Sequence, residues 1–327
     1  MEDEEFVEIL FFGLLGRAPD AAARRNFVSA LKNGADPRLL YAQVFNSQEF
    51  AERTKNIKCN PNSVGEVCVT DGSVALLPEH QDKALRMLGR LAPMDVIGFN
   101  KVRVGRDNDG GYVMIDDFEG IAGAYSLGIS DDVSWDRQIA ERGIRVFQYD
   151  HTINSLPEEH QNFRWSKLKI ADCSDAKQGT TSIPDQFILN GHSPNRDYIL
   201  KVDIEGAEWD VFAAVDANFL DSFRQIVCEF HHINEVSKTD KFEKMYRAVC
   251  NLTAHHSIVH VHGNNYARWA VIGGVPVPDV LEVTLVRSRD KEFKPASGTF
   301  PSQFDQPNSP HFADLMLGSF RFGAVHN

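Results

Sequence analysis

The stretch that decides the fold is Tyr198–Trp209, YILKVDIEGAEW, which changes character halfway along. Its first half is mostly apolar and rich in β-branched residues, a composition typical of a buried parallel strand. Its second half places Asp203, Glu205 and Glu208 around Gly206. A carboxylate inside a buried strand would lose its hydration, so we place Asp203 and Glu205 at the carboxyl end of this strand. In open α/β sheets, ligands bind at that edge.

These acids have two interpretations. Gly206 permits a tight turn, and Glu208 then falls in the first turn of a helix, where the helix dipole favours an anion. All three carboxylates would in that case simply be solvated. We interpret Asp203 and Glu205 as site residues, and Glu208 as an ordinary charge at a helix start.

Composition and charge narrow the class of protein. The chain has 327 residues, enough for one sizeable α/β domain and a smaller unit. Its net charge of -12 argues against nucleic-acid binding, which needs clustered lysine and arginine. The acidic start MEDEEF is unlike a signal peptide, and the apolar run 6–15 is too short for a membrane span. The five cysteines lack CxxC spacing, so we expect a reduced, cytoplasmic protein without a membrane partner.

The N-terminal residues predict a small all-α bundle over 1–55. Short amphipathic helices are expected to begin near Asp3, after Pro19 and after Asp36, with a last one ending at Phe50. The segments LLGRAPD and FNSQEF resemble a bacterial domain of unknown function found in glycan-related and surface-associated proteins. This resemblance covers residues 4–53 and implies an accessory module that would recruit a protein partner. Residues 56–77 are typical of a linker.

Strands and helices alternate through residues 78–327, which predicts a doubly wound α/β sheet. The expected strands are 123–130, 144–149, 167–170, 198–204 and 223–230, with helices at 133–142, 182–189 and 240–255. Two late strands, 257–262 and 281–287, have no long helix between them and are expected to form an antiparallel edge.

A hairpin is expected before this sheet. Residues 101–104 and 112–115 would be its strands, joined through the turn residues Asn108 to Gly111. Either this is a plain hairpin, or Gly110 and Gly111 bring backbone N–H groups close to a ligand.

The first strand of the sheet predicts a cofactor site. It ends in SLGIS, with Gly128 and Ser130, and Asp150 follows about 20 residues later, the spacing of an acid that grips ribose hydroxyls. The second glycine that admits a pyrophosphate is missing, which favours a nucleoside cofactor such as S-adenosylmethionine. Asp172 follows the next strand and would accept a hydrogen bond from the adenine amino group, unless it is an ordinary turn residue.

Several segments, taken together, resemble the FkbM-type S-adenosylmethionine-dependent methyltransferases. They are GRDNDGGYVM, AYSLGISDDVSWD, VFQYDHT, LKVDIEGAEWDVF, CEFHH, HGNNY and VPDVLEVTLVR, in that order within residues 78–310. The resemblance implies a class I methyltransferase (Rossmann-like) fold, a mostly parallel seven-stranded sheet, and methylation of hydroxyl groups on sugars or sugar-bearing metabolites. The sequence departs from the family pattern at SLGIS, which replaces a glycine-rich loop.

The strand 223–230 carries candidate catalytic groups at its end. Glu229 and His231 are two residues apart, so they should share a side and meet Asp203 of the neighbouring strand. His231 is either the general base, with a carboxylate orienting it, or a ligand with Asp203 and Glu229 of Mg²⁺ or another divalent metal. The resemblance permits such a metal. A third interpretation is a buried acid–histidine pair without chemistry.

Polar residues after the strand 257–262 are candidates for substrate binding. His262, Asn264 and Asn265 both donate and accept hydrogen bonds, which suits a hydroxyl-rich acceptor, although an asparagine-rich turn explains them equally well. We therefore expect an O-methyltransferase acting on a sugar or glycan-type acceptor, with Glu205 and Asp203 beside the base. The alternatives are an NAD- or nucleotide-sugar-dependent sugar-modifying enzyme, and a non-catalytic glycan-associated binding protein.

Overall fold

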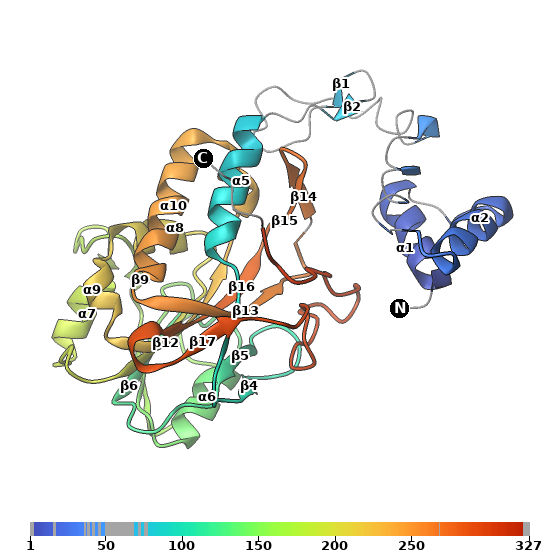
Figure 1. The fold of residues 1–327 in the computed structure, drawn as a ribbon. Coiled ribbons are helices and arrows are strands. Elements are labelled where there is room, and N and C mark those ends of the chain that lie inside the picture. The colour runs from blue at the N-terminus through green and yellow to red at the C-terminus, as the bar shows by residue number, and fades with distance from the viewer. Residues whose placement is uncertain are drawn as a thin grey trace. The chain divides into compact units, whose positions relative to one another are not determined.

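The computed structural model describes residues 3–15, 18–35, 69–70, 73–74, 78–267 and 269–322, with isolated positions between 37 and 49. It divides into two compact units, Met1–Leu77 and Pro78–Asn327 (Figure 1). Within the described residues, no helix combines the length and the apolar character that crossing a bilayer requires.

The N-terminal unit contains helices α1 (Asp3–Leu15) and α2 (Ala21–Lys32). Asp20 caps α2, because its Oδ1 accepts hydrogen bonds from the backbone N–H groups of Ala22 and Ala23 at 2.9 and 2.8 Å. A small apolar cluster joins the two helices, formed by Val7, Leu10, Phe11, Val28, Leu40 and Val44. The expected third and fourth helices lie mostly outside the described residues, so the all-α bundle stays a prediction.

Most of the predicted linker, 56–77, also lies outside the described residues. Where it is described, β1 (Val69–Thr70) pairs with β2 (Ser73–Val74) in an antiparallel two-stranded sheet.

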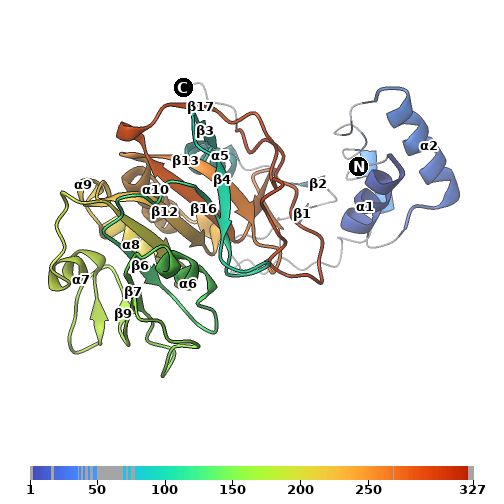
Figure 2. The same ribbon diagram turned by 90° about the horizontal axis from the view of Figure 1, so that it is seen from below.

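A seven-stranded sheet forms the centre of the second unit, in the order β13–β16–β12–β11–β6–β7–β8. The strands are β6 (Gly123–Leu127), β7 (Val146–Tyr149), β8 (Phe163–Ser166), β11 (Tyr198–Val202), β12 (Phe223–Phe230), β13 (His256–Gly263) and β16 (Leu281–Arg287). The first five run parallel, and β16 lies antiparallel between β12 and β13. Figure 2 labels β13, β16, β12, β6 and β7 of this sheet. The predicted α/β class and mostly parallel sheet are confirmed.

One strand differs from the prediction. The edge strand β8 occupies 163–166 instead of 167–170, and β9 (Lys169–Ile170) leaves the main sheet to pair with β10 (Thr180–Thr181). Only Phe163 of β8 is buried, so this edge strand lacks the apolar alternation by which it would be recognised.

Helices cover one face of the sheet, and a helix with a hairpin covers the other (Figure 1). The first face holds α5 (Pro78–Arg90), α7 (Ile183–Leu189), α8 (Glu208–Ala214) and α10 (Thr239–Thr253). The second holds α6 (Ser134–Glu141) with β4 (Lys101–Val104) and β5 (Tyr112–Ile115). The remaining elements are β3 (Met94–Val96), α9 (Ala217–Leu220), β14 (Trp269–Ile272), β15 (Val275–Pro278), β17 (Phe293–Pro295) and two 3-10 turns, Ile233–Ser237 and Ser288–Asp290.

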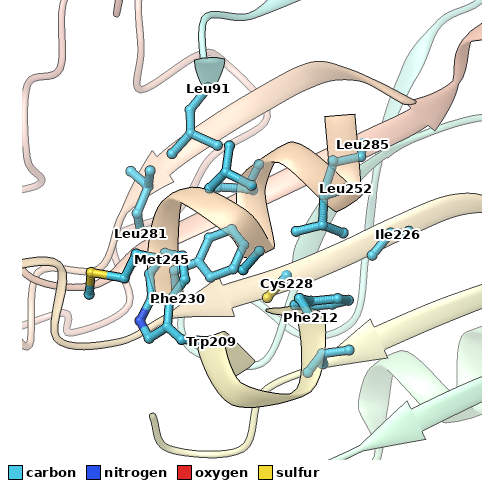
Figure 3. Packing of buried hydrophobic residues seen from close by; sticks show 14 of the residues in the cluster. Leu91, Trp209, Phe212, Ile226, Cys228, Phe230, Met245, Leu252, Leu281 and Leu285 are labelled. Atoms are coloured by element: carbon cyan, nitrogen blue, oxygen red, sulfur yellow. The ribbon is translucent and has the colours of Figure 1, made fainter. Parts of the chain in front are cut away.

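The core of the first face is aromatic and aliphatic. Trp209 of α8 stacks on Phe230 of β12, with ring centroids 4.3 Å apart, and Met245 and Leu252 of α10 belong to the same cluster (Figure 3). Burying such side chains is the main favourable contribution to folding. It also fixes the start of α8 against the end of β12, where the candidate site residues lie.

The predicted hairpin is present, and polar bonds fix it on the sheet. The side chain of Gln225 accepts a hydrogen bond from the Ile115 N–H and donates one to its carbonyl, both at 2.9 Å. Thr284 Oγ1 donates to the Val113 carbonyl at 2.6 Å. Because these bonds cross from β12 and β16 to β5, the residues before β5 are held over the carboxyl ends of the strands.

The order of the strands reverses between β6 and β11, since the chain continues from β6 to β7 on one side and later returns to β11 on the other. Gly128 follows β6 and lies directly against Asp203, which follows β11. Its φ is +83°, and a Cβ there would lie 1.6 Å from the Asp203 carbonyl oxygen. Only glycine allows the two strand ends to approach this closely.

A pair of glycine substitutions tests this constraint. Gly128→Ala should lower the free energy of unfolding by roughly 2 to 5 kcal/mol, the sum of a strained φ and of overpacking. Gly143 has a φ of +80° with nothing within 4 Å of its would-be Cβ, so Gly143→Ala should cost only about 1 to 2 kcal/mol. Urea-induced unfolding measures the free energy of unfolding of both variants. Equal losses would contradict the close approach of the two strand ends.

Candidate functional site

A cavity of about 330 Å³ opens at the carboxyl ends of β6, β7 and β11. Its wall includes five of the predicted site residues: Gly128, Ser130, Asp150, Asp203 and Glu205. Ligands are expected at this position, because the loops after β6 and β11 diverge there and leave a crevice. The acids that follow the β11 strand therefore reach the cavity as the sequence predicts.

Asp150 holds the loop after β6. Its Oδ2 accepts the N–H groups of Ile129 and Ser130, each at 2.9 Å, and its Oδ1 accepts the N–H and the hydroxyl of Thr152 at 2.7 and 2.6 Å. Burial alone would raise the pKa of Asp150, but these bonds outweigh it and lower the pKa. Each oxygen already accepts two hydrogen bonds, so a ribose would have to share them. Its contact with ribose stays a prediction.

Lys201 and Tyr112 belong to the site although the sequence analysis missed them. Lys201, buried in β11, donates from Nζ to the Gly128 carbonyl at 2.8 Å and lies 5.7 Å from the centre of the Tyr112 ring. The Tyr112 hydroxyl donates to Asp203 Oδ2 at 3.1 Å. The sequence did contain a signal for Lys201, since it is a lysine within an otherwise apolar strand. A buried cation needs a partner, so such a lysine indicates a polar contact nearby.

Glu208 is buried and not solvated, which corrects the sequence-based interpretation. Its carboxylate folds back onto the turn before α8, where it accepts the N–H groups of Ile204 and Gly206 at 2.8 and 2.9 Å. Its Oε1 also lies 3.2 Å from His231 Nδ1. A carboxylate can only accept here, so Nδ1 carries the hydrogen, and in the neutral imidazole the Nε2 lone pair is available.

His231 has a raised pKa. Burial disfavours its imidazolium, but the hydrogen bond and charge of Glu208, with the charges of Asp203 and Glu205, outweigh burial and raise the pKa to about 8. Its Nε2 lies 3.5 Å from carboxylate oxygens of both Glu205 and Glu229. Glu205 links the imidazole to the cavity, since it lines the cavity and contacts Nε2. The geometry is that of an oriented histidine beside a ligand-sized space.

Two acidic groups of potential metal ligands lie at this edge. Asp203, Glu205 and His231 form one, and Asp109, Glu229 and Glu282 form the other, with ligand atoms within 4.8 Å of one another in each. The expected metal set of Asp203, Glu229 and His231 is thus divided between the two groups. Mg²⁺ prefers oxygen ligands alone, so the group with the imidazole fits it poorly. A metal held by His231 stays a prediction.

The residues expected to bind substrate contact the chain itself. Asn264 Nδ2 donates to Glu229 Oε1 at 2.8 Å, and Asn265 Nδ2 donates to the carbonyls of Ser309 and Phe312 at 2.9 and 3.0 Å. None of the three predicted residues lines the cavity, so their contact with substrate stays a prediction.

His262 lies between two carboxylates, 2.9 Å from Glu282 Oε2 and 3.0 Å from Asp314 Oδ1. Burial would lower its pKa, but these charges and hydrogen bonds raise it to about 10. The imidazole is therefore positively charged at neutral pH.

Three further predicted cofactor residues lie outside the cavity wall. A Cβ at Gly110 would meet Asp132 Oδ2 at 2.3 Å, and one at Gly111 would meet the Arg106 carbonyl oxygen at 2.1 Å. Close packing of the turn therefore explains these glycines, as the plain-hairpin alternative proposes. Asp172 is exposed on the surface, and its contact with adenine stays a prediction.

The loops around the cavity contain strained backbone. Ser130, Glu205 and His232 have positive φ values of 51°, 56° and 59° although none is glycine. Such conformations cost of order 1–3 kcal/mol each and concentrate at functional sites. All three follow directly after the ends of strands β6, β11 and β12.

The comparison with family models agrees with this geometry. Residues 124–255 match the model described as Methyltransferase FkbM domain, and residues 1–54 match Domain of unknown function (DUF4214). The first match begins in β6 and ends just after α10, so it contains the cavity loops, Glu208 and His231. A search of curated proteins gave no match. Both resemblances read from the sequence are thereby confirmed.

The coupling of His231 to Glu208 can be measured by NMR titration of the imidazole. The wild-type pKa should lie near 8, and Glu208→Gln should lower it toward or below the ordinary value of about 6.5, because burial then dominates. Glu205→Gln is the control. Its side chain is 87% exposed, so water screens its charge and the decrease should be smaller. A pKa that stays near 8 without Glu208 would contradict the assignment.

Proposed function

We propose that this chain, which contains a methyltransferase domain of the FkbM family, is an S-adenosylmethionine-dependent O-methyltransferase acting on a sugar or sugar-containing acceptor. One observation carries the proposal: a ligand-sized cavity at the strand-order reversal lies beside an imidazole oriented by a buried carboxylate. Neither a cavity nor a histidine alone would suggest group transfer. Together they support a cofactor site next to a base.

The cavity wall fits a cationic nucleoside better than a dinucleotide. Three carboxylates, Asp150, Asp203 and Glu205, face it with one lysine, Lys169. Carboxylates repel a pyrophosphate and attract the positive sulfonium and amino groups of S-adenosylmethionine. The volume of the cavity lies within the range of small-molecule sites. When bound, S-adenosylmethionine supplies an electrophilic methyl group.

His231 is the proposed general base. Its Nε2 would accept the proton of the acceptor hydroxyl, while Glu208 fixes the tautomer and stabilises the imidazolium. The Tyr112 hydroxyl donates a hydrogen bond to Asp203 Oδ2, which fixes the orientation of that carboxylate. These groups accept hydrogen bonds and so suit an acceptor rich in hydroxyls. Holding the hydroxyl in line with the methyl group would supply much of the remaining acceleration.

The N-terminal unit enters the proposal as an accessory module. Its described core is a small apolar cluster between α1 and α2, and the matched family carries no assigned chemistry. We propose that it recruits a protein partner to the enzyme.

Calorimetry with purified full-length protein tests the cofactor. We expect micromolar binding of S-adenosylmethionine and of its demethylated product, and no heat with NAD or with a nucleotide sugar. A preference for NAD would reject the proposal. Incubation with isotopically labelled S-adenosylmethionine and a glycan extract should then yield sugar species that gain one methyl, detected by mass spectrometry. If a different class of acceptor gains the label, the proposed sugar acceptor is wrong, whereas the proposed methyltransferase activity is supported.

Replacement of the base tests the mechanism. His231→Gln should lower kcat by roughly 10²- to 10⁴-fold, with S-adenosylmethionine affinity little changed, because the side chain lies outside the cavity wall. The active form is the neutral imidazole, so wild-type kcat should rise with pH through about 8. His255→Gln is the matched control, since His255 precedes β13 at the opposite edge of the sheet. Unchanged kcat in His231→Gln would remove the base from the mechanism.

A further inference from the structure

The peptide group between Gly128 and Ile129 belongs to the cavity wall, and charged side chains hold both of its polar atoms. Lys201 Nζ donates to the Gly128 carbonyl at 2.8 Å, and the Ile129 N–H donates to Asp150 Oδ2 at 2.9 Å. The lysine comes from β11, and the aspartate follows β7. Hydrogen bonds to charged groups are stronger than neutral ones, so this peptide is fixed between a cation and an anion.

Lys201 holds the side of the loop that Asp150 does not reach. Asp150 Oδ2 accepts the N–H groups of Ile129 and Ser130, whereas the Gly128 carbonyl accepts from Lys201 alone among the residues that the structure describes. Gly128 has a φ of +83° and Ser130 one of +51°. Because glycine adopts many backbone conformations at little cost, the loop sequence by itself does not fix the direction of this carbonyl.

The ammonium of Lys201 belongs to a buried side chain, since the residue is only 6% exposed. It lies 5.7 Å from the centre of the Tyr112 ring. Burial raises the pKa of Asp136 on α6, and the charge of Lys201 opposes that rise. A buried ammonium is costly unless polar groups replace its lost hydration. The Gly128 carbonyl provides its hydrogen bond, while Tyr112 and Asp136 add electrostatic support.

Gln148 offers a matched comparison on the same face of the sheet. Lys201 pairs in register with Ser126 of β6, and Ser126 pairs with Gln148 of β7, so the three side chains point the same way. Gln148 is also buried, but its Nε2 donates to Asp136 Oδ1 at 3.0 Å, and it lies outside the cavity wall. Removing this hydrogen bond therefore perturbs the core near Lys201 without touching the loop.

We propose that Lys201 is a positioning residue, which fixes the Gly128–Ile129 peptide and so keeps the cavity in the shape that binds the cofactor. This role rests on the proposed function, in which S-adenosylmethionine occupies the cavity. Lys201 lies outside the cavity wall, so it acts through the loop and does not touch the ligand. Its charge also strengthens the Ile129 N–H as a donor, because hydrogen bonds in series polarise one another. A wall ordered beforehand loses less conformational freedom on binding.

Calorimetry and steady-state kinetics of the full-length protein test this role. Lys201→Met keeps an unbranched side chain and removes the charge. It should weaken binding of S-adenosylmethionine and of its demethylated product by roughly tenfold or more, the effect of one lost hydrogen bond to a charged group. The KM for S-adenosylmethionine should rise by the same factor, while kcat at saturating cofactor stays nearly unchanged, because His231 is untouched. Gln148→Met is the control and should leave both cofactor affinity and KM as in the wild type.

Hydrogen exchange of the Ile129 and Ser130 amides provides a readout that needs no ligand. In Lys201→Met these two amides should exchange faster relative to the amides of β6 and β11, because the loop loses the bond that fixes its carbonyl. In Gln148→Met they should exchange as in the wild type. A lysine that only stabilised the fold would change the protection of the strands and the loop together.

Two results would overturn the positioning role: unchanged exchange of both loop amides in Lys201→Met, or equal loss of cofactor affinity in Lys201→Met and Gln148→Met. Wild-type protein that binds no S-adenosylmethionine would instead reject the proposed function, and the exchange of the loop amides would then decide the role of Lys201. If Lys201→Met does not fold, Lys201→Gln serves for the same measurements. Its amide still donates but carries no charge, so the expected losses are smaller and in the same direction.

Discussion

The carboxylate of Glu208 connects the parts of the molecule that the candidate site needs. It accepts two backbone N–H groups from the turn after β11 and holds Nδ1 of His231 at the end of β12. Those bonds fix the turn in which Glu205 adopts a positive φ. A fully buried carboxylate is costly unless each oxygen is paired, and here both oxygens are. One side chain thus sets the backbone of the cavity wall and the orientation of the imidazole together.

The sequence predicted the sheet well because its signals are local. Apolar runs, turn glycines and acids after strands are properties of consecutive residues. These signals singled out Gly128, Ser130, Asp150, Asp203 and Glu205, which the structure brings to one cavity. Glu208 was misjudged because spacing at a helix start indicates a charge near the dipole but not whether that charge is buried. The edge strand β8 was misplaced because only one of its side chains is buried.

The residues that sequence reasoning missed come from distant segments. Tyr112 meets Asp203 across 91 positions, and Asn308 meets Asp109 across 199. No periodicity links such residues, since their proximity follows from the hairpin crossing β12 and β16 and from the C-terminal segment returning to the strand ends. Lys201 was visible as a cation in an apolar strand, yet its partner, the Gly128 carbonyl, is a backbone atom that sequence patterns do not reveal.

The two acidic groups, one around His231 and one around Glu229, differ in how the repulsion between their carboxylates is reduced. Around His231, the hydrogen bond and charge of Glu208, with the charges of Asp203 and Glu205, outweigh burial and raise the pKa of the imidazole to about 8. Around Glu229, burial and the neighbouring carboxylates instead raise the pKa of the acid itself well above its usual range. The first arrangement keeps a group that titrates near neutral pH beside the cavity, as acid–base chemistry requires.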